Sequence, residues 1–254
     1  MKVTNKMTRR KHIALKDSDR VFVLTGAGIS AESGLATFRG SNGLWAGERV
    51  EDVASPQGWQ RDPELVWRFY SERREAAAEA VPNAAHLAVA AWERSLGDRF
   101  FLCTQNVDDL HERAGSQNLV HMHGELFQSC CDTCTRAPFP DTELYLSKAD
   151  HRRCQCGGRI RPNIVWFGEV PFQMERIFSE LMRCTVMLVV GTSGVVQPAA
   201  SFVRWANEHH SCAEDLRTYY VGPEHPANAA AFTQVFKGRD GELLPQILAP
   251  SGRF

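Results

Sequence analysis

An apolar run that leads directly into a glycine-containing turn constrains this chain more than any other feature of its sequence. Val21–Thr25 reads as a buried strand, and Gly26, Gly28 and Ala31 follow it with the spacing G-x-G-x-x-G/A. In dinucleotide-binding folds the first glycine permits a tight turn, and the second lets the backbone approach a pyrophosphate. The helix that follows offers unpaired N–H groups to this anion. A strand-to-helix turn without a ligand gives the same pattern, so the rest of the chain has to decide.

The order of apolar and amphipathic segments predicts an α/β fold. Further strands are expected at Phe100–Thr104, at Val186–Val190 and at residues 218–221, and the first two run into polar or glycine-containing loops. Such strands are typical of a parallel sheet that binds its ligand at their carboxyl ends. Helices are expected at Pro63–Glu79 and at residues 83–94. We therefore expect a Rossmann-like parallel sheet with helices on both faces.

Composition limits the classes of partner. The chain has 254 residues and a net charge of −1, so it can form one sizeable core with a smaller unit, and it has no overall attraction for nucleic acid or membranes. No apolar run is long enough to cross a membrane. We expect no direct nucleic-acid or membrane partner. Residues 1–12 read as a solvated, disordered tail, and a transit peptide is the alternative.

The cysteines predict a metal site rather than a disulfide scaffold. There are eight, too few for a disulfide-rich fold. Two close pairs, nineteen residues apart, predict a tetrahedral site for one structural Zn²⁺, and these cysteines are Cys131, Cys134, Cys154 and Cys156. Four unligated thiols are the alternative, and Cys130 is a competing ligand with poorer spacing. Cys103 and Cys184 lie in or beside apolar runs and read as buried, reduced thiols, which favours a reducing, cytoplasmic compartment.

Six stretches in order along the chain resemble those of the sirtuins, which are NAD-dependent protein-lysine deacylases. They are residues 26–40, residues 104–111, His123-Gly124, the four cysteines of the predicted zinc site, residues 165–169 and residues 191–193. The resemblance implies NAD as co-substrate and acylated lysine side chains of proteins as substrate. We expect a discontinuous NAD-binding domain over residues 13–40, 95–125 and 162–254. A small domain would combine a helical module (41–94) with a zinc ribbon (126–161), and we expect a monomer.

The resemblance also assigns the cofactor contacts. Phe38 would cover the nicotinamide ribose, and Arg39 would contact the phosphates. The remaining positions are Gly26, Ala27, Gly28, Glu32, Gln105, Asn106, Asp108, Gly191, Thr192, Ser193 and Asp240. The amide and carboxylate groups of Gln105, Asn106 and Asp108 suit hydrogen bonds to the ribose and the nicotinamide carboxamide. Taken alone, residues 106–108 could equally form an ordinary Asx turn.

Two histidines compete for the role of general base. The family's catalytic histidine directly precedes a glycine, which selects His123 over His121. A neutral imidazole can accept a ribose hydroxyl proton near pH 7. The resemblance implies that the acyl oxygen attacks the ribose 1′ carbon as nicotinamide leaves, with His123, Asn106 and Asp108 as the catalytic residues. The products would be free lysine, nicotinamide and an O-acyl-ADP-ribose.

Two further regions resemble the family's substrate contacts. Residues 165–169 look like the edge on which the acylated peptide lies as an added strand, although a core strand would also explain them; they are Val165, Trp166, Phe167, Gly168 and Glu169. Tyr70 and Arg73 share one face of a helix and resemble the pair that binds succinyl, malonyl or glutaryl groups in one class of sirtuins. Ala54 matches the small residue that widens this pocket. Arg73 as a surface residue of a charged run is the alternative, and acetyl removal can coexist with the acidic acyl activity.

The chain departs from the family pattern at three positions. Ala36 replaces a proline, Gly222 replaces an asparagine that contacts the adenosine ribose, and Asp240 replaces a cysteine near the adenine. Two other functions stay open. One is protein ADP-ribosyl transfer, whose specialists in the family tend to lack the histidine. The other is a non-catalytic NAD-binding interaction module, which does not require Asn106, Asp108 and His123 together.

Overall fold

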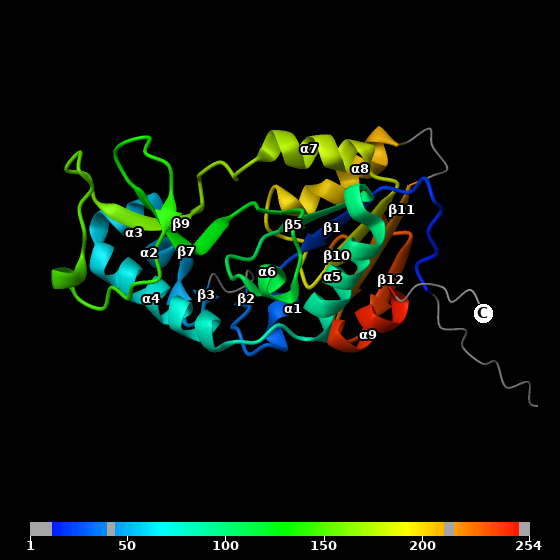
Figure 1. Ribbon diagram of the computed structural model, residues 1–254, viewed down its shortest axis with the longest axis horizontal. Coiled ribbons are helices and arrows are strands. Elements are labelled where there is room, and N and C mark those ends of the chain that lie inside the picture. The colour runs from blue at the N-terminus through cyan, green and yellow to red at the C-terminus, as the bar shows by residue number, and fades with distance from the viewer. Residues whose placement is uncertain (1–11, 40–43, 211–215, 249–254) are drawn as a thin grey trace, which may run out of the picture.

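The computed structural model describes residues 12–39, 44–210 and 216–248, and its largest element is a sheet of six parallel strands (Figure 1). The sheet has the order β12-β11-β10-β1-β5-β6. Its strands are β1 (Val21–Thr25), β5 (Phe100–Thr104), β6 (Leu119–His121), β10 (Val186–Val190), β11 (Arg217–Gly222) and β12 (Gln234–Lys237). The strands expected at Val21–Thr25, Phe100–Thr104 and Val186–Val190 are confirmed residue for residue, and the fourth is one residue longer at each end.

Helices cover both faces of this sheet, as the α/β pattern predicts. Alternate residues of β1 point to opposite faces, so Val21 and Val23 enter one core while Phe22 and Leu24 enter the other. The first core is closed by α1 (Gly28–Ala31), α5 (Ala84–Leu96) and α9 (Asp240–Ile247). The second is closed by α7 (Met174–Arg183) and α8 (Phe202–His209). Shorter pieces are α6 (Leu110–Ala114) and the 3₁₀ turns η2 (Gly97–Arg99), η3 (Lys148–Asp150), η4 (Ala199–Ser201) and η5 (Ala229–Ala231).

A second, smaller unit lies at the other end of the molecule, to the left in Figure 1. Its antiparallel sheet has the order β8-β7-β9, and a short three-stranded sheet lies near it. These strands are β7 (Gly124–Cys131), β8 (Phe139–Pro140), β9 (Ile160–Ile164), β2 (Phe38–Arg39), β3 (Leu44–Trp45) and β4 (Glu48–Arg49). The helices are α2 (Val50–Val53), α3 (Pro56–Arg61) and α4 (Pro63–Glu79), the last with the predicted bounds. Three tryptophans fill the core of the unit, namely Trp59, Trp67 and Trp166.

A buried arginine fastens α4 to the small sheet. The side chain of Arg74 is 1% exposed, and it donates to the carbonyls of Leu126 and Glu143 at 2.8 and 2.6 Å. The side chain of Asp141 is equally buried, and its Oδ2 forms an ion pair with Arg74 Nη1 at 3.5 Å. A charged residue of this kind is stable inside a core only when it is paired and hydrogen-bonded. The charged run of residues 72–75 is therefore not a uniformly exposed helix face.

The fold groups α5 with the large sheet. Its apolar face, with Ala85, Val89 and Trp92, packs in the same core as β1, although the sequence boundaries placed most of this helix in the helical module. We propose that the helical module of the small unit ends before Ala84. The predicted tail lies almost wholly outside the described residues, and no helix among those described is long and apolar enough to span a membrane.

Candidate active site

The two glycine loops of the predicted cofactor site touch each other at the carboxyl edge of the large sheet. Gly26 N donates to Val190 O at 3.0 Å, and Gly28 N donates to Gly191 O at 2.7 Å. A Cβ on Gly28 would lie 2.6 Å from Gly191 Cα, and one on Gly191 would lie 2.3 Å from Ile29 N. Gly191 also has a φ of 62°, which favours glycine. Close packing between the two loops therefore requires these glycines before any ligand is considered.

The amides at the start of α1 are largely engaged within the protein. Ile29 N donates to Gly26 O at 3.1 Å and Ser30 N donates to Ala27 O at 3.2 Å, in addition to the bonds made by Gly26 and Gly28. The helix has four residues. The expectation of a row of unpaired N–H groups is therefore wrong for these four amides. A phosphate at this loop would need other donors or a local rearrangement.

A compact hydrogen-bonded cluster lies beneath this edge. Asn106 Nδ2 donates to Ser30 Oγ at 3.0 Å, and Ser30 Oγ donates to Asp108 Oδ2 at 3.0 Å. Asn106 and Asp108 are 6% and 7% exposed. The other carboxylate oxygen of Asp108 accepts from Leu110 N at 3.2 Å. Burial raises the pKa of Asp108 above its usual value, while the bonds from Leu110 and Ser30 favour the ionised form.

The N-terminus of α5 supports the same cluster. His86 Nδ1 accepts from Asn83 N at 3.3 Å, so the proton is on Nε2, which donates to Ser30 Oγ at 3.4 Å. Burial lowers the pKa of His86 to about 4, so the ring is neutral near pH 7. Asn83, the predicted cap, also donates to Ile29 O at 2.8 Å. Ser30 and His86 were not predicted from the sequence, although the capping position of Asn83 three residues before His86 was a usable signal.

The two candidate histidines differ in their hydrogen bonds. His121 uses both ring nitrogens, toward Asn106 O at 2.8 Å and toward Glu112 Oε1 at 2.6 Å. Burial lowers the pKa of His121, but the bonds to Glu112 outweigh this effect and the net shift is upward. The ring of His123 makes one bond, from Nδ1 to Gln105 O at 3.1 Å, and burial lowers its pKa. A neutral His123 therefore carries its proton on Nδ1 and leaves Nε2 as an acceptor.

Glu32 and Asp240 meet at the start of α9. Glu32 Oε1 accepts from Gly241 N at 2.9 Å, so its carboxylate caps this helix. The Asp240 side chain is 2% exposed, and its Oδ1 has no hydrogen-bond partner among the described residues. Burial, and then the nearby charge of Glu32, raise the pKa of Asp240 to about 7. The structure brings these two predicted cofactor residues together, with Glu32 turned to the protein backbone.

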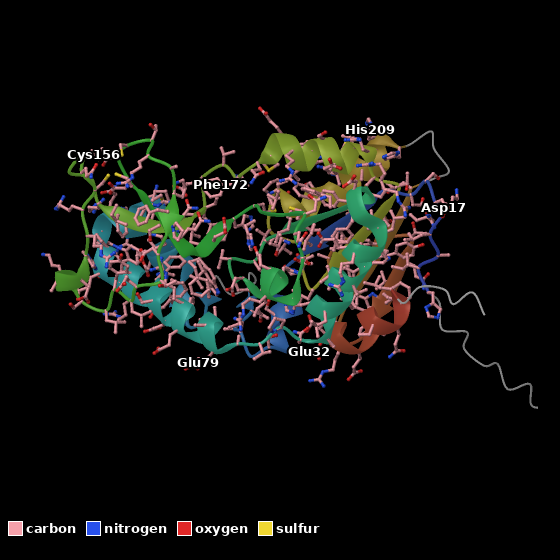
Figure 2. The ribbon with its side chains drawn as sticks, viewed as in Figure 1. Asp17, Glu32, Glu79, Cys156, Phe172 and His209 are labelled. Atoms are coloured by element: carbon pink, nitrogen blue, oxygen red, sulfur yellow. The ribbon has the colours of Figure 1, made fainter. Side chains whose placement is uncertain are left out.

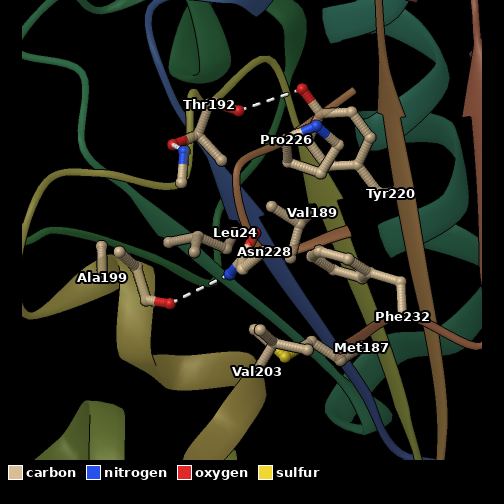
Figure 3. A pocket seen from close by; sticks show the side chains of 12 residues that line it. Leu24, Met187, Val189, Thr192, Ala199, Val203, Tyr220, Pro226, Asn228 and Phe232 are labelled. Atoms are coloured by element: carbon tan, nitrogen blue, oxygen red, sulfur yellow. Dashed lines mark hydrogen bonds between the residues drawn. The ribbon is translucent and has the colours of Figure 1, made fainter. Parts of the chain in front are cut away.

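The loop after β10 closes over a small, mostly apolar pocket (Figure 3). The hydroxyl of Tyr220 donates to Thr192 O at 3.0 Å, and Ser193 O accepts weakly from Ala227 N at 3.4 Å. A Cβ on Gly222 would lie 2.6 Å from Tyr220 Oη. The phenol of Tyr220 therefore occupies the space into which a side chain at position 222 would extend. This contact gives a physical reason for the glycine where the family pattern has asparagine.

Tyr70 and Arg73 lie in the small unit beside Trp166. The side chain of Tyr70 is fully buried, and Trp166 Nε1 donates to its hydroxyl at 3.1 Å. The guanidinium of Arg73 lies 4.2 Å from the ring centroid of Phe69, and its Nη2 reaches Glu72 at 3.4 Å. Its Nη1 is buried with no hydrogen-bond partner among the described residues, and burial lowers the pKa of Arg73. Arg73 is thus largely enclosed, with a side-chain exposure of 20%.

The predicted substrate edge, residues 165–169, is a turn rather than an extended strand. Glu169 N donates to Trp166 O at 2.9 Å, and Gly168 has a φ of 93°. Val165 N donates to His123 O at 2.9 Å, and Phe167 N donates to Ala54 O at 3.0 Å. The segment therefore links the histidine of the large unit to the wall of the small one. The core-strand alternative also fails, because β9 ends at Ile164.

An ion pair closes this turn. Glu169 accepts two bonds from Arg161, at 2.8 and 3.0 Å, and one from Trp166 N at 2.8 Å. Burial raises the pKa of Glu169, but these bonds outweigh it and the net shift is downward. The carboxylate is therefore engaged within the protein. Phe172, which follows the turn, lies between the two units in Figure 2.

The four predicted zinc ligands form one cluster at the far end of the small unit, where Figure 2 labels Cys156. Their sulfur atoms all lie within 4.8 Å of one another, with 3.5 Å between Cys131 and Cys156 and 3.8 Å between Cys134 and Cys154. Zinc–sulfur bonds of about 2.3 Å in a tetrahedron place sulfurs about 3.8 Å apart, so the cluster fits Zn²⁺. Cys130 lies outside it, with Sγ 3.9 Å from Pro162 O. The predicted ligand set is confirmed as a cluster.

Three predicted cofactor residues remain. Phe38 and Arg39 form β2, and their side chains lie outside the described part of the chain. Gln105 lies directly after β5, where its N donates to Thr25 O at 2.9 Å and its carbonyl accepts from His123. Gln105, Asn106 and Asp108 follow β5, and Gly191, Thr192 and Ser193 follow β10, at the carboxyl edge of the sheet as a parallel sheet requires. Glu32 lies at the end of α1, and Asp240 is the first residue of α9.

Comparisons with known proteins agree with this arrangement. A protein-family model described as the Sir2 family matches residues 26–198. The NAD-dependent protein deacylase of Salmonella typhimurium is 47% identical over 238 residues, which cover 92% of this chain and 84% of that protein. That of Shigella flexneri is 45% identical over 236 residues, covering 91% and 84%.

The solved structures that match include complexes. A Sir2 homologue in complex with NAD has a TM-score of 0.81 at 38% identity, covering 91% of this chain and 89% of that one. A Sir2 protein bound to an acetylated peptide has a TM-score of 0.76 at 27% identity, covering 90% of this chain and 92% of that one. Similarity of this extent covers both units of the fold.

Proposed function

The chain belongs to the Sir2 family of NAD-dependent protein deacylases, and we propose that it removes acyl groups from protein lysines with His123 as the general base. The observation that carries this proposal is the orientation of His123. Its Nδ1 bond to Gln105 O fixes the tautomer, and its burial lowers the pKa, so Nε2 is free to accept a proton near pH 7. His121, with both nitrogens engaged, has no such free acceptor.

The loops of the large unit would hold NAD, and a Sir2 homologue has been solved in complex with NAD. Gly26, Ala27 and Gly28 would face it from one loop, and Gly191, Thr192 and Ser193 from the other. Asn106 and Asp108, held through Ser30, would orient the ribose and the nicotinamide carboxamide. NAD supplies an electrophilic ribose carbon and accepts the acyl group. With one water consumed to release the lysine amine, nicotinamide, O-acyl-ADP-ribose and free lysine are the proposed products.

The acylated peptide would bind along residues 165–170. A homologous Sir2 protein has been solved with an acetylated peptide. Phe167, and Val170 directly after the turn, are 49% and 78% exposed, so apolar side chains face solvent here. Recognition through backbone predicts loose sequence selectivity. The bonds to His123 and to Ala54 make this turn a suitable support for a lysine that reaches between the two units.

The acyl group would enter the small unit beside Tyr70 and Arg73, and we propose that this pocket accepts acidic acyl groups. Arg73 Nη1 is buried without a partner, which is costly unless an acceptor is supplied. A succinyl or malonyl carboxylate provides that acceptor, and an acetyl group does not. Because Tyr70 is fully buried, the acyl chain has to displace part of its covering, which includes the ring of Trp45 at 6.0 Å.

Mass spectrometry tests both levels of the proposal. Matched peptides carrying acetyl-lysine or succinyl-lysine are incubated with the protein and NAD, and acyl loss and nicotinamide release are measured together. Loss of succinyl in step with nicotinamide release supports the deacylase and its acidic pocket. Loss of acetyl alone keeps the deacylase and rejects the pocket. Labelled ADP-ribose attached to protein, without acyl loss, would point to a transferase instead.

We also propose a monomer in a reducing, cytoplasmic compartment. All seven described cysteines are free, and Cys103 and Cys184 are buried in the core of the large unit. The four in the cluster suit a thiolate site for zinc.

A further inference from the structure

The hydroxyl of Tyr70 is held from one side only. Trp166 Nε1 donates to Tyr70 Oη at 3.1 Å. An indole N–H can only donate, so the phenol oxygen is the acceptor and its own proton has to point elsewhere. No described residue accepts that proton, although the side chain is fully buried. Burial also raises the pKa of Tyr70, which keeps the proton in place at neutral pH.

A second donor nearby lacks an acceptor in the same way. Arg73 lies three residues after Tyr70 on the same face of α4, and its Nη1 is buried without a partner. Both groups border the ring of Phe69, whose centroid lies 4.2 Å from the Arg73 guanidinium and 5.2 Å from the Tyr70 ring centroid. A carboxylate, with two oxygens and several lone pairs, can accept from both.

Trp166 itself has little freedom. The guanidinium of Arg161 lies 3.6 Å from its ring centroid, and Glu169 holds both Arg161 and the backbone N of Trp166. On another side the ring of Trp59 packs at 5.9 Å. The side chain of Trp166 is 2% exposed. The indole N–H therefore points at Tyr70 from a fixed position.

We propose that Trp166 is a positioning residue for acyl selectivity, whose indole N–H occupies the oxygen of Tyr70 and turns the phenol proton toward the acyl carboxylate beside Arg73. This inference rests on the proposed acidic pocket and adds the group that orients the phenol proton of Tyr70 within it. Without the indole, the phenol can rotate its proton and accept from Arg73 instead. The pocket then loses an oriented donor while keeping its shape and its charge.

Trp166→Phe tests this role, because it removes the N–H and keeps an aromatic ring. The quantity measured is the ratio of kcat/KM for succinyl-lysine to that for acetyl-lysine peptide. We expect this ratio to fall about tenfold, the effect of one hydrogen bond, mainly through a higher KM for the succinyl peptide. Trp67→Phe is the matched control. Its indole is also fully buried in the same core and donates to Ile160 O at 3.1 Å, and its loss should leave the ratio within about twofold.

A double-mutant cycle separates positioning from packing. In a Tyr70→Phe background the phenol is absent, so Trp166→Phe should change the ratio no further. An equal fall in both backgrounds, or an unchanged ratio in the single variant, overturns the role of Trp166. If the proposed acidic pocket is itself wrong, Tyr70→Phe and Arg73→Met will each leave the succinyl-to-acetyl ratio unchanged. The failures of the two proposals can therefore be told apart. Circular dichroism and the unfolding temperature of each variant confirm that it is folded.

Discussion

Two of the buried polar regions in the described part of this protein differ in how completely they satisfy their own hydrogen bonds. At the edge of the large sheet, the hydroxyl of Ser30 accepts from Asn106 and His86 and donates to Asp108. In the small unit, no described residue accepts from the hydroxyl of Tyr70 or from Nη1 of Arg73. Buried polar groups in native proteins are nearly always paired, so an unpaired group calls for an explanation.

The difference assigns different tasks to the two regions. A network with matched donors and acceptors resists rotation of its side chains, which suits groups that orient reactants. A pair of donors without acceptors loses stability until a ligand arrives, which suits selection of that ligand. Chemistry would therefore depend on the large unit and acyl choice on the small one. Three substitutions test this division, and a fourth tests the protonation of Asp240 at the start of α9.

The largest effect is expected from His123→Ala. Removal of the general base should lower kcat by about 10³-fold on both acetyl and succinyl peptides. The base acts on a ribose hydroxyl, which is the same whichever acyl group the peptide carries. The variant should keep its unfolding temperature and bind NAD, measured by calorimetry. His209→Ala, at an exposed position in α8, is the control. Wild-type turnover in the folded variant would remove His123 from the mechanism.

Arg73→Met should change selectivity rather than chemistry. Loss of a charge-assisted pair with the acyl carboxylate should lower the ratio of succinyl to acetyl kcat/KM by about 10–100-fold. Competition between the two peptides in one reaction gives this ratio directly. A parallel loss on both substrates would contradict the division between the units and return Arg73 to a structural role.

Ser30→Ala should lower the rate for both peptides without changing the preference between them. Asn106 and Asp108 each lose one bond while Asp108 keeps the bond from Leu110, so we expect kcat/KM to fall about tenfold. The fall should be equal for both peptides, and the ratio should not change. A selective effect on succinyl-lysine would mean that the two regions are coupled.

Asp240→Asn should have the smallest effect, seen in stability. The folded pKa of Asp240 is about 7 and the usual value for Asp is about 3.9, so the folded state binds the proton more tightly. Stability from this group is therefore complete at low pH and is lost as pH rises from about 4 to about 7. We expect the variant to gain about 2–4 °C in unfolding temperature at pH 8 and little at pH 4.5. Equal gains at both pH values would contradict the assigned protonation.

Local patterns predicted the elements well and their mutual contacts less well. The strand Val21–Thr25 and the helix Pro63–Glu79 follow from apolar periodicity, which needs only neighbouring residues. The zinc cluster follows from cysteine spacing. The contact between Gly28 and Gly191, by contrast, joins residues far apart in the sequence. No local pattern could show that these two loops pack against each other.

The site shows the same limit. Asn106, Asp108 and His123 follow from motifs, but the bonds that orient them come from Ser30, His86 and Gln105 through the fold. The turn at residues 165–169 reads as a strand because its first three residues are apolar. Gly168 and the bonds of Glu169 bend it instead. The bond from Trp166 to Tyr70 spans 96 positions and has no signature in the sequence.

The backbone bonds from Val165 to His123 and from Phe167 to Ala54 have a consequence for how such proteins diverge. They involve main-chain atoms, so they survive almost any side-chain exchange in the acyl pocket. A lineage can therefore trade Tyr70, Arg73 or Ala54 for other residues and acquire a new acyl preference while the catalytic histidine keeps its place. The same property makes the pocket a favourable target for directed evolution, because libraries built there vary specificity over an undisturbed reaction centre.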